Sequence, residues 1–446
     1  MKKNLFAIGI GFLLIGASIF SACTKEGPMG PAGTNGTNGT NGTNGTDGTA
    51  GCITCHNPTT VDLVATQYEL SKHSYGEAST SEAGNTGCGP CHESEAFKYV
   101  CANNVPVTFT KNATTGKYSN DYASIPSAAY GAISCGTCHS SIHSTYGRTD
   151  LPALTTVAPV KSTMWAGAQT LDAPADGGIG NLCVKCHQPR PFTASLTDGN
   201  VLDYNALATN PTAIFYDSTT GATTNKLVPG YRTHTHYGTA GAIYTGKCGI
   251  EFSGSVVYGN STHTAVASCQ DCHMADITGK AGGHSFFAAG NFNGCNKSGC
   301  HTGLTASDPT HWVNPRAAVK TLLDNLAAKL KENGVEILNR NPDATTNLWA
   351  GKTTNNYDGY LNIYDPVNNP SGPANNPGGT FRNPSPSSSW TAAQKALNAS
   401  FPKIRLTNAQ MGAIINFQLC MRDYSLGIHN NKYTTALLTN TIAILP

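Results

Sequence analysis

The feature that most constrains this chain is a short cysteine–histidine pattern that recurs along it. In five places two cysteines have two residues between them, and a histidine directly follows the second cysteine. These motifs are Cys52-Ile-Thr-Cys55-His56, Cys88-Gly-Pro-Cys91-His92, Cys135-Gly-Thr-Cys138-His139, Cys183-Val-Lys-Cys186-His187 and Cys269-Gln-Asp-Cys272-His273. A sixth motif, Cys295-Asn-Lys-Ser-Gly-Cys300-His301, has four residues between its cysteines. Twelve of the 16 cysteines therefore share one arrangement.

The C-x-x-C-H arrangement is the attachment signature of c-type haem. Two thiols form thioethers with the porphyrin vinyl groups, and the adjacent histidine presents its imidazole to the iron as the proximal ligand. Zinc ribbons or disulfides would not need a histidine after every second cysteine. We therefore predict six haem c groups (iron), with His56, His92, His139, His187, His273 and His301 as proximal ligands. For Cys295 and Cys300, whose spacing resembles a wider variant of the motif in some multihaem cytochromes, the alternative is a disulfide.

The composition of the chain is unusual for a globular protein of 446 residues. Only 12% of residues are charged, Gly (48) and Pro (24) are plentiful, and long stretches show no helical or strand period. Such a chain has difficulty burying enough apolar side-chain surface to offset the entropy of ordering. We therefore predict a mainly irregular fold with short α-helices, cored by porphyrins, whose apo-chain does not fold. The net charge of +2 gives no indication of a nucleic-acid partner.

A six-coordinate iron needs a second axial ligand, and eight further histidines are candidates for that position. They are His73, His143, His234, His236, His263, His284, His311 and His429. Their number suffices for bis-His ligation of six irons, which keeps potentials lower than Met/His ligation. His143 follows its own motif too closely to reach the far face of that haem, so we expect it to serve a neighbour. His234 and His236 share a face in an extended chain, and only one can ligate a given iron.

The N-terminus has the form of an export signal. Lys2 and Lys3 precede an uncharged apolar stretch over residues 5–20, which predicts a signal peptide over residues 1–22. Cys23 follows Ser21-Ala22 and resembles the lipidated cysteine of bacterial lipoproteins. An ordinary signal peptide with an incidental Cys23 is the alternative. The prediction is an exported protein, lipid-anchored at the outer membrane on its periplasmic or cell-surface side.

A glycine repeat follows the predicted anchor. Every third residue from Gly27 to Gly51 is glycine, which is the Gly-X-Y spacing of collagen. Within this repeat proline occurs only at Pro28 and Pro31, so a collagen triple helix would be marginal. We predict a flexible tether over residues 23–51, with homo-oligomerisation through this segment as the alternative.

The composition changes after the sixth motif, so residues 52–312 are predicted to form a hexahaem cytochrome domain and residues 313–446 a helical region that packs on it. One helix is predicted to start at Asn314-Pro315 and end at Gly334. Others are predicted over 390–399, 408–424 with Thr407 as its cap, and 432–444, whereas 366–386 is a predicted loop. Cys101, Cys248 and Cys420 remain outside the motifs, and at most one pair of them can form a disulfide.

The C-terminal segment NFQLCMRDYSLGIHNNKYTTALL, residues 416–438, carries a resemblance to a known family. It is similar to the helix–GxHN–helix end of multihaem cytochromes related to nitrite reductase and hydroxylamine oxidoreductase. The resemblance implies that His429 ligates a haem. Those nitrite reductases typically have a lysine in the catalytic haem motif, whereas all six motifs here end in histidine.

Taken together, these features predict electron transfer through six covalently bound haems at the cell envelope. The predicted partners are other redox proteins or a periplasmic or extracellular electron acceptor, and no catalytic residue is assigned. One alternative is an oxidoreductase that acts on a small nitrogen or sulfur compound at one open-coordination haem. Another is a collagen-like interaction protein whose haems are secondary.

Overall fold

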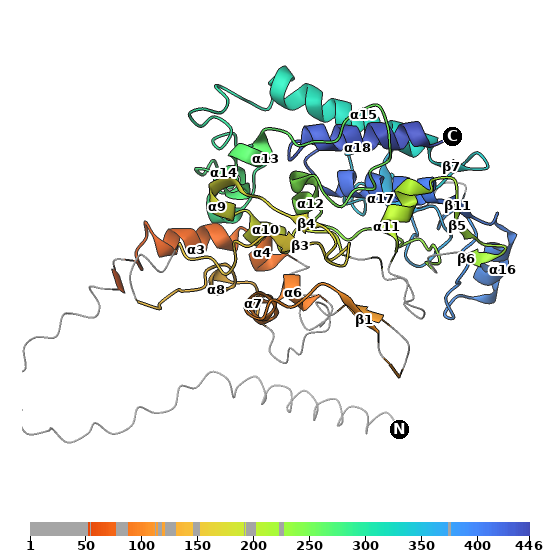
Figure 1. Cartoon of the computed structure of the whole chain (residues 1–446), viewed down its shortest axis with the longest axis horizontal. Helices are drawn as coiled ribbons and strands as arrows, with labels where there is room; N and C mark the ends of the chain where they lie inside the picture. The colour runs from red at the N-terminus through yellow and green to blue at the C-terminus, as the bar shows by residue number, and fades with distance from the viewer. Residues whose placement is uncertain are drawn as a thin grey trace, which may run out of the picture. The chain divides into compact units, whose positions relative to one another are not determined.

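The structure is a computed structural model. It describes residues 52–53, 55–76, 88–111, 113–114, 118–120, 131–145, 152–190, 192, 202–222, 227–372 and 376–446. The predicted signal peptide, Cys23 and the Gly-X-Y tether lie outside the described residues. Cys52–Pro446 form one compact unit of short helices and small sheets, joined by long irregular segments (Figure 1). None of the helices in these described ranges combines the length and the apolar character needed to cross a membrane.

The first described part, up to residue 145, contains short helices and one hairpin. Its helices are α3 (Val61–Glu69), α4 (Lys72–Tyr75), α6 (Gly89–His92), α7 (Ser94–Ala102) and α8 (Cys135–Cys138). Strands β1 (Phe109–Lys111) and β2 (Tyr118–Asn120) pair antiparallel. The apolar cluster here is small, with Ala96, Val100 and Val107 as its buried members.

The middle part, residues 152–313, is built in the same way. Its helices are α9 (Ala175–Gly178), α10 (Asn181–Val184), α11 (Tyr204–Thr209), α12 (Ala240–Thr245), α13 (His263–Val266), α14 (Cys269–His273), η4 (Gly283–Ser285) and η5 (Pro309–Val313). Its strands are β3 (Val160–Lys161), β4 (Thr170–Leu171), β5 (Ile214–Asp217) and β6 (Gly221–Ala222).

Long helices are confined to the C-terminal part. They are α15 (Asn314–Lys329), α17 (Asn408–Arg422) and α18 (Asn431–Ile444), with the shorter α16 (Ala392–Ser400) between them. The strands are β7 (Lys331–Glu332), β8 (Val335–Glu336), β9 (Leu338–Arg340), β10 (Tyr357–Leu361) and β11 (Arg405–Thr407). β11 pairs with β5 and β5 with β6, all antiparallel, so the last third of the chain shares a sheet with the middle part.

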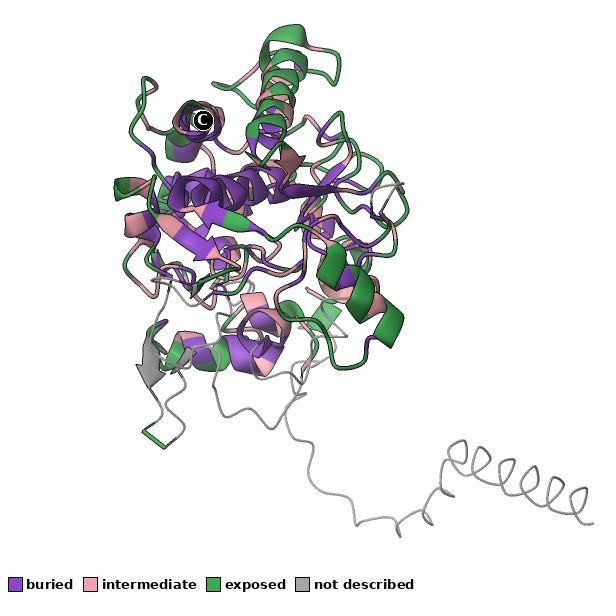
Figure 2. Cartoon of the chain, turned by 90° about the vertical axis from the view of Figure 1, so that its right-hand side faces the viewer, coloured by how far each residue is buried: buried purple, intermediate pink, exposed green. Residues whose placement is uncertain are grey.

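Helix α17 starts at the predicted cap. The Thr407 side chain accepts from the Gln410 backbone N–H, and the Gln410 side chain accepts from the Thr407 backbone N–H, which forms a capping box. Every residue of α17 is buried (purple in Figure 2). The helix contacts α11, α12, α15, α18, β5, β10 and β11 and is thus the central element of this part.

One helix prediction is wrong at its end. Helix α15 stops at Lys329, not near Gly334, and the next residues form the two-stranded hairpin β7–β8. Asn333 and Gly334 lie between the strands with φ of 48° and 80°. Asn-Gly is the favoured pair for a type I′ hairpin turn, because both positions need positive φ. The glycine therefore marks a turn between strands and not a helix end.

The main apolar core corrects a second prediction. Its buried members come from residues 160–252 and 319–445, and include Phe215, Phe252, Trp349 and Phe417. The expectation that this chain has difficulty building a core from its own side chains is therefore wrong for these two stretches. It holds for residues 52–145 and 253–318, which contribute no buried member to the main core among the described residues. Five of the six cysteine–histidine motifs lie in those poorly cored stretches.

The packing of α17 gives a direct test of this core. A Cβ on Gly412 would lie 2.5 Å from Cζ of Phe252 and 3.1 Å from Cγ2 of Ile250. Overpacking costs about 1–3 kcal/mol, whereas alanine gains about 1 kcal/mol over glycine in a helix. We expect Gly412→Ala to lower the free energy of unfolding by about 1 kcal/mol, because the overpacking cost at so close a contact exceeds the gain in helix propensity.

The matched control is Gly230→Ala, because nothing lies within 4 Å of the Cβ that it would add. Thermal unfolding followed by circular dichroism should give a lower melting temperature for Gly412→Ala and an almost unchanged one for Gly230→Ala. Equal melting temperatures for the two variants would contradict the packing described.

Candidate functional site

Each motif folds into a single turn that brings its histidine beside its cysteines. The backbone N–H of the histidine donates to the carbonyl of the first cysteine, at 2.7 Å for His56, 3.1 Å for His92, 2.9 Å for His139 and 2.9 Å for His187. The sixth motif closes in the same way, because the His301 N–H donates to the Cys295 carbonyl at 2.9 Å. Gly299 has a φ of 84° in the longer loop of that motif, which glycine adopts without strain. The wider spacing therefore preserves the closing bond of the shorter motifs.

The histidines of the six motifs each face a second histidine. The ring centroids lie 5.9 Å apart for His56–His143, 6.3 Å for His92–His236, 6.3 Å for His139–His284, 5.9 Å for His187–His73, 6.0 Å for His273–His429 and 6.0 Å for His301–His263. All twelve are among the described residues. In each pair the second histidine belongs to a different segment of the chain from the motif it faces.

The spacing within these pairs fits one metal ion between two imidazoles. A ligating imidazole nitrogen lies about 2.0 Å from its metal, so two rings on opposite sides of one ion have centroids roughly 6.3 Å apart. The observed separations run from 5.9 to 6.3 Å. Among the described residues, no cluster of three or more His, Cys, Asp or Glu side chains could hold a bare metal ion. Each pair could supply two axial ligands to one iron, and a porphyrin would supply the four equatorial nitrogens.

Two of the eight candidate histidines do not take part in a pair of this spacing. His311 lies 4.7 Å from His301, which is too close for an ion between the rings. His234 faces Tyr237 and Tyr360 and accepts a hydrogen bond from Arg422. The neighbouring His236 faces His92 instead, so the two histidines of this segment have different surroundings. His143 faces the first motif and not its own, as the sequence predicts.

The second ring nitrogen of several paired histidines is already bonded to the protein. Nδ1 of His273 donates to the Phe286 carbonyl at 2.9 Å, and Nδ1 of His263 donates to the Ile428 carbonyl at 3.4 Å. Nδ1 of His429 bonds to Oδ1 of Asp423 at 2.5 Å. A partner on Nδ1 fixes the tautomer and the orientation of a metal-ligating histidine and leaves Nε2 for the metal. Three of the paired rings therefore have the second ligand sphere that axial ligation needs.

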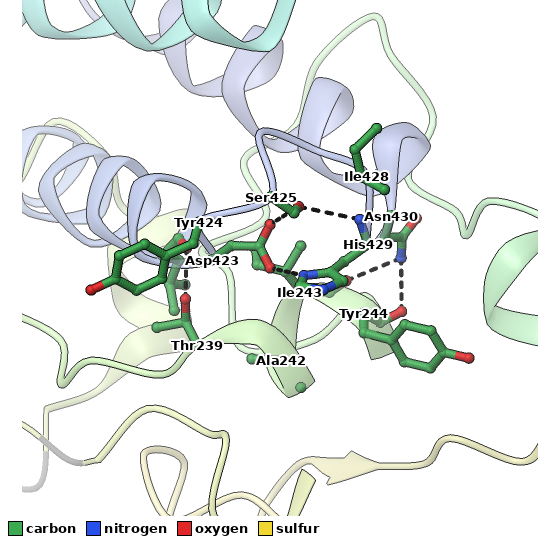
Figure 3. Close-up of polar contacts among 12 residues, drawn as sticks. Thr239, Ala242, Ile243, Tyr244, Asp423, Tyr424, Ser425, Ile428, His429 and Asn430 are labelled. Atoms are coloured by element: carbon green, nitrogen blue, oxygen red, sulfur yellow. Dashed lines mark hydrogen bonds and ion pairs between the residues drawn. The ribbon is translucent and has the colours of Figure 1, made fainter. Parts of the chain in front are cut away.

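The loop between α17 and α18 holds His429 through a dense polar network (Figure 3). Oγ of Ser425 donates to Asp423 and accepts the His429 backbone N–H. Nδ2 of Asn430 donates to the carbonyls of Ile243 and Tyr244, at 3.1 Å each. Its Oδ1 accepts the Tyr433 N–H and caps α18. The Gly-Ile-His-Asn sequence thus ties both helices to α12 and fixes the ring of His429.

Burial keeps most of these imidazoles neutral. It lowers the pKa of His187, His234 and His236 to about 3, and it lowers the pKa of His73, His273 and His284 as well. His429 differs: burial acts to lower its pKa, but the Asp423 carboxylate outweighs burial and the pKa is raised. The neutral imidazole is the form that ligates a metal.

Thiols of different motifs meet in the structure. In three pairs the two thiols lie close enough to shift each other's pKa: Cys91 with Cys186, Cys183 with Cys269, and Cys272 with Cys295. Cys138 of the third motif lies close enough to act electrostatically on Cys183 and Cys186. The fourth motif, around His187, is therefore next to the second, third and fifth motifs, and the fifth is next to the sixth.

Of the cysteines outside the motifs, the three that the structure describes form no disulfide. Cys101, Cys248 and Cys420 are free, and Cys248 and Cys420 are buried. Cys295 and Cys300 are free as well, so the disulfide considered as their alternative is not formed in the structure.

Two charged residues near the histidine pairs were not predicted from the sequence. Asp423 binds the ring of His429, and Arg422 donates to His234. Neither belongs to a motif with fixed spacing. Each meets its histidine only in the folded chain, at the C-terminal end of α17. No sequence signal short of the fold could have selected them.

No family model, curated protein or solved structure matches this chain.

The sixth motif offers a test of the spacing argument. For the haem predicted at this motif, we expect His263→Ala to convert a low-spin iron to high-spin, because His263 has the axial spacing to His301. His311→Ala should leave every iron low-spin, since its ring is too close to His301. Electron paramagnetic resonance (EPR) of the two oxidised variants distinguishes these outcomes, and a high-spin signal in His311→Ala alone would reverse the assignment.

Proposed function

We propose that this chain is a multihaem c-type cytochrome that carries electrons through six covalently attached, bis-His-ligated haems. The observation that carries the proposal is the facing of each motif histidine by a second histidine at 5.9–6.3 Å between ring centroids. A bound haem supplies an iron that alternates between the ferric and ferrous states. The chain supplies both axial imidazoles and, through its cysteines, the covalent attachment.

The cysteine contacts support a connected relay. The thiols that would carry the porphyrin edges meet between the second and fourth motifs, the fourth and fifth, and the fifth and sixth. Short separation between redox groups favours electron transfer between them. The His187 site is the branching point of this arrangement, and the His301 site lies at one end of it. We infer that electrons pass through the His187 site whichever end they enter.

The full pairing of the motif histidines separates this proposal from the oxidoreductase alternative. An enzyme that binds a small substrate at iron needs one position without a protein ligand. All six motif histidines are described, and a second histidine faces each of them. We therefore propose a role in electron transfer and assign no catalytic residue.

The cellular setting follows from the sequence alone. We propose that the chain is exported, lipidated at Cys23 and tethered to the outer membrane by residues 23–51. Its proposed partners are redox proteins or a terminal acceptor on the periplasmic or outer side.

The experiment that tests the proposed function combines EPR with film voltammetry. The angle between the two ring planes is small in three pairs (32°, 33° and 29°) and close to a right angle in the other three (76°, 82° and 77°). We expect two classes of low-spin ferric signal in equal amounts. Voltammetry should show reversible waves without catalytic current on nitrite, hydroxylamine or sulfite. A stoichiometric high-spin signal together with a catalytic wave would overturn the electron-carrier proposal in favour of an enzyme.

A further inference from the structure

The C-terminal end of α17 places two adjacent residues of opposite charge beside different histidines. Arg422 ends the helix, and Asp423 follows it. Nη1 of Arg422 donates to Nδ1 of His234 at 2.7 Å. Nδ1 of His429 donates to Oδ1 of Asp423 at 2.5 Å, as Figure 3 shows. One helix end therefore carries a cation toward the segment of the second motif's partner and a carboxylate toward the partner of the fifth motif.

The histidine pair of the second motif meets positive charge from two arginines. Nη1 of Arg190 lies 3.6 Å from Sγ of Cys88, the first cysteine of this motif. The Cζ atom of Arg422 lies 5.1 Å from the ring centroid of Tyr237, and that centroid lies 5.4 Å from the centroid of His236. Burial lowers the pKa of His236 to about 3, and the charges of Arg190 and Arg422 lower it further.

Neither arginine acts at full strength. Arg190 is exposed, so solvent screens part of its charge. The carboxylate of Asp358 is buried and acts on Arg422, so it offsets part of that charge. The two arginines nevertheless act on His236 with the same sign, since both lower its pKa. The second motif therefore has a positive electrostatic environment from two sources that are far apart in the sequence.

The histidine pair of the fifth motif meets a buried negative charge. The Asp423 side chain is 1% exposed, and its carboxylate raises the pKa of His429 against the effect of burial. Burial lowers the pKa of His273, and the Asp423 charge opposes that shift as well. The motif's own Asp271 is paired with Lys297 at 2.8 Å and so adds little net charge. A carboxylate on Nδ1 makes an axial imidazole a stronger donor, which stabilises ferric iron.

The fourth motif lies between these two sites and has neither charge. Its Cys186 lies close to Cys91 of the second motif, and its Cys183 lies close to Cys269 of the fifth. After burial, the largest effects on the pKa of His187 come from histidines of the neighbouring pairs. Neutral imidazoles carry no fixed charge. We therefore expect the potential of this site to lie between the potentials of its two neighbours.

We propose that the relay is directional: the reduction potential falls from the second motif through the fourth to the fifth, so electrons that enter at the fifth motif collect at the second. The inference rests on the proposed function, since it orders three haems of that proposal. A nearby cation favours ferrous iron, which carries one positive charge less than ferric iron, whereas a nearby carboxylate favours ferric iron. Each step moves one electron from ferrous iron at one site to ferric iron at the next.

Potentiometric titration followed by EPR on the unaltered protein tests the order. The ring planes cross at 82° in the pair of the second motif and at 29° in that of the fifth, so we expect their ferric signals in different low-spin classes. The signals lost in His236→Ala, His73→Ala and His429→Ala assign the second, fourth and fifth sites. On stepwise reduction of the unaltered protein, these three signals should disappear in that order. Any other order overturns the inference.

Arg190→Gln tests the charge without disturbing the core, because the Arg190 side chain is exposed. It should lower the potential of the second-motif site alone and bring it closer to that of the fifth. Arg405→Gln is the matched control, since Arg405 is a surface arginine that pairs with Asp217, and it should leave all potentials unchanged. An unchanged second-motif potential in Arg190→Gln overturns the inference.

A haem count on each preparation keeps the two proposals apart. Six low-spin haems whose potentials follow a different order overturn the direction alone. Fewer than six haems in the unaltered protein contradicts the proposed function.

Discussion

Without covalent haem, the chain should lose its structure over residues 52–145 and 253–313 while residues 319–445 stay largely folded. The reason lies in the distribution of side-chain core. The two stretches that carry five of the motifs contribute no buried residue to the main apolar core, whereas α17 and its neighbours supply much of it. Burial of apolar surface is the main term that offsets chain entropy, so a stretch without it depends on the bound group.

Hydrogen exchange measured by mass spectrometry on protein made with and without cytochrome-maturation machinery tests this expectation. The colourless chain should exchange amide hydrogens in the motif stretches within seconds and keep protection in α17. In the coloured protein both parts should be protected. Equal protection of the two parts in the colourless chain would contradict the uneven core described above.

Replacement of His429 by alanine should convert one low-spin iron to high-spin without loss of any haem. The proposed covalent bonds to Cys269 and Cys272 and the proposed ligand His273 are unaffected, so the haem count should remain six while one axial position opens. His311→Ala is the matched control and should leave the spin states unchanged. EPR and a haemochrome assay on both proteins provide the measurements. An unchanged spectrum in His429→Ala would remove His429 from the axial ligands.

Asp423→Asn probes the same site more gently. The carboxylate holds Nδ1 of His429 at 2.5 Å and makes the imidazole a stronger donor to the iron. Loss of such an outer partner typically changes metal affinity 10–100-fold, which corresponds to about 60–120 mV for a one-electron couple. We expect one potential to rise by about that amount while every iron stays low-spin. A shift of all six potentials, or of none, would contradict a local role for Asp423.

The turn at each motif could be predicted from the sequence because its residues are local. Two cysteines and a histidine within one turn define each predicted attachment site, and all six motifs fold into such turns; haem attachment at them stays a prediction. The cap of α17 was predictable for the same reason, since Thr407 and Gln410 are three residues apart. The hairpin after α15 was missed because Gly334 alone suggests a helix end, whereas Asn333-Gly334 together indicate a turn between strands.

The partner of each motif histidine was beyond prediction from the sequence. His73 faces His187 and His284 faces His139 across more than a hundred residues, and these contacts depend on the whole fold. His234 and His236 could not be ranked, because an extended segment presents both on one face. The fold decides between them, because Arg422 at the end of α17 hydrogen bonds to His234, whereas His236 lies opposite His92. The amount of side-chain core was underestimated because composition averages over cored and uncored stretches.

Anomalous X-ray scattering at the iron edge, on crystals of the mature protein, tests the central claim most directly. We predict six iron atoms. Each should lie midway between the two imidazole rings of one histidine pair and beside the cysteines of its motif. Fewer than six irons, or metal ions held by cysteine thiolates away from the paired rings, would contradict it.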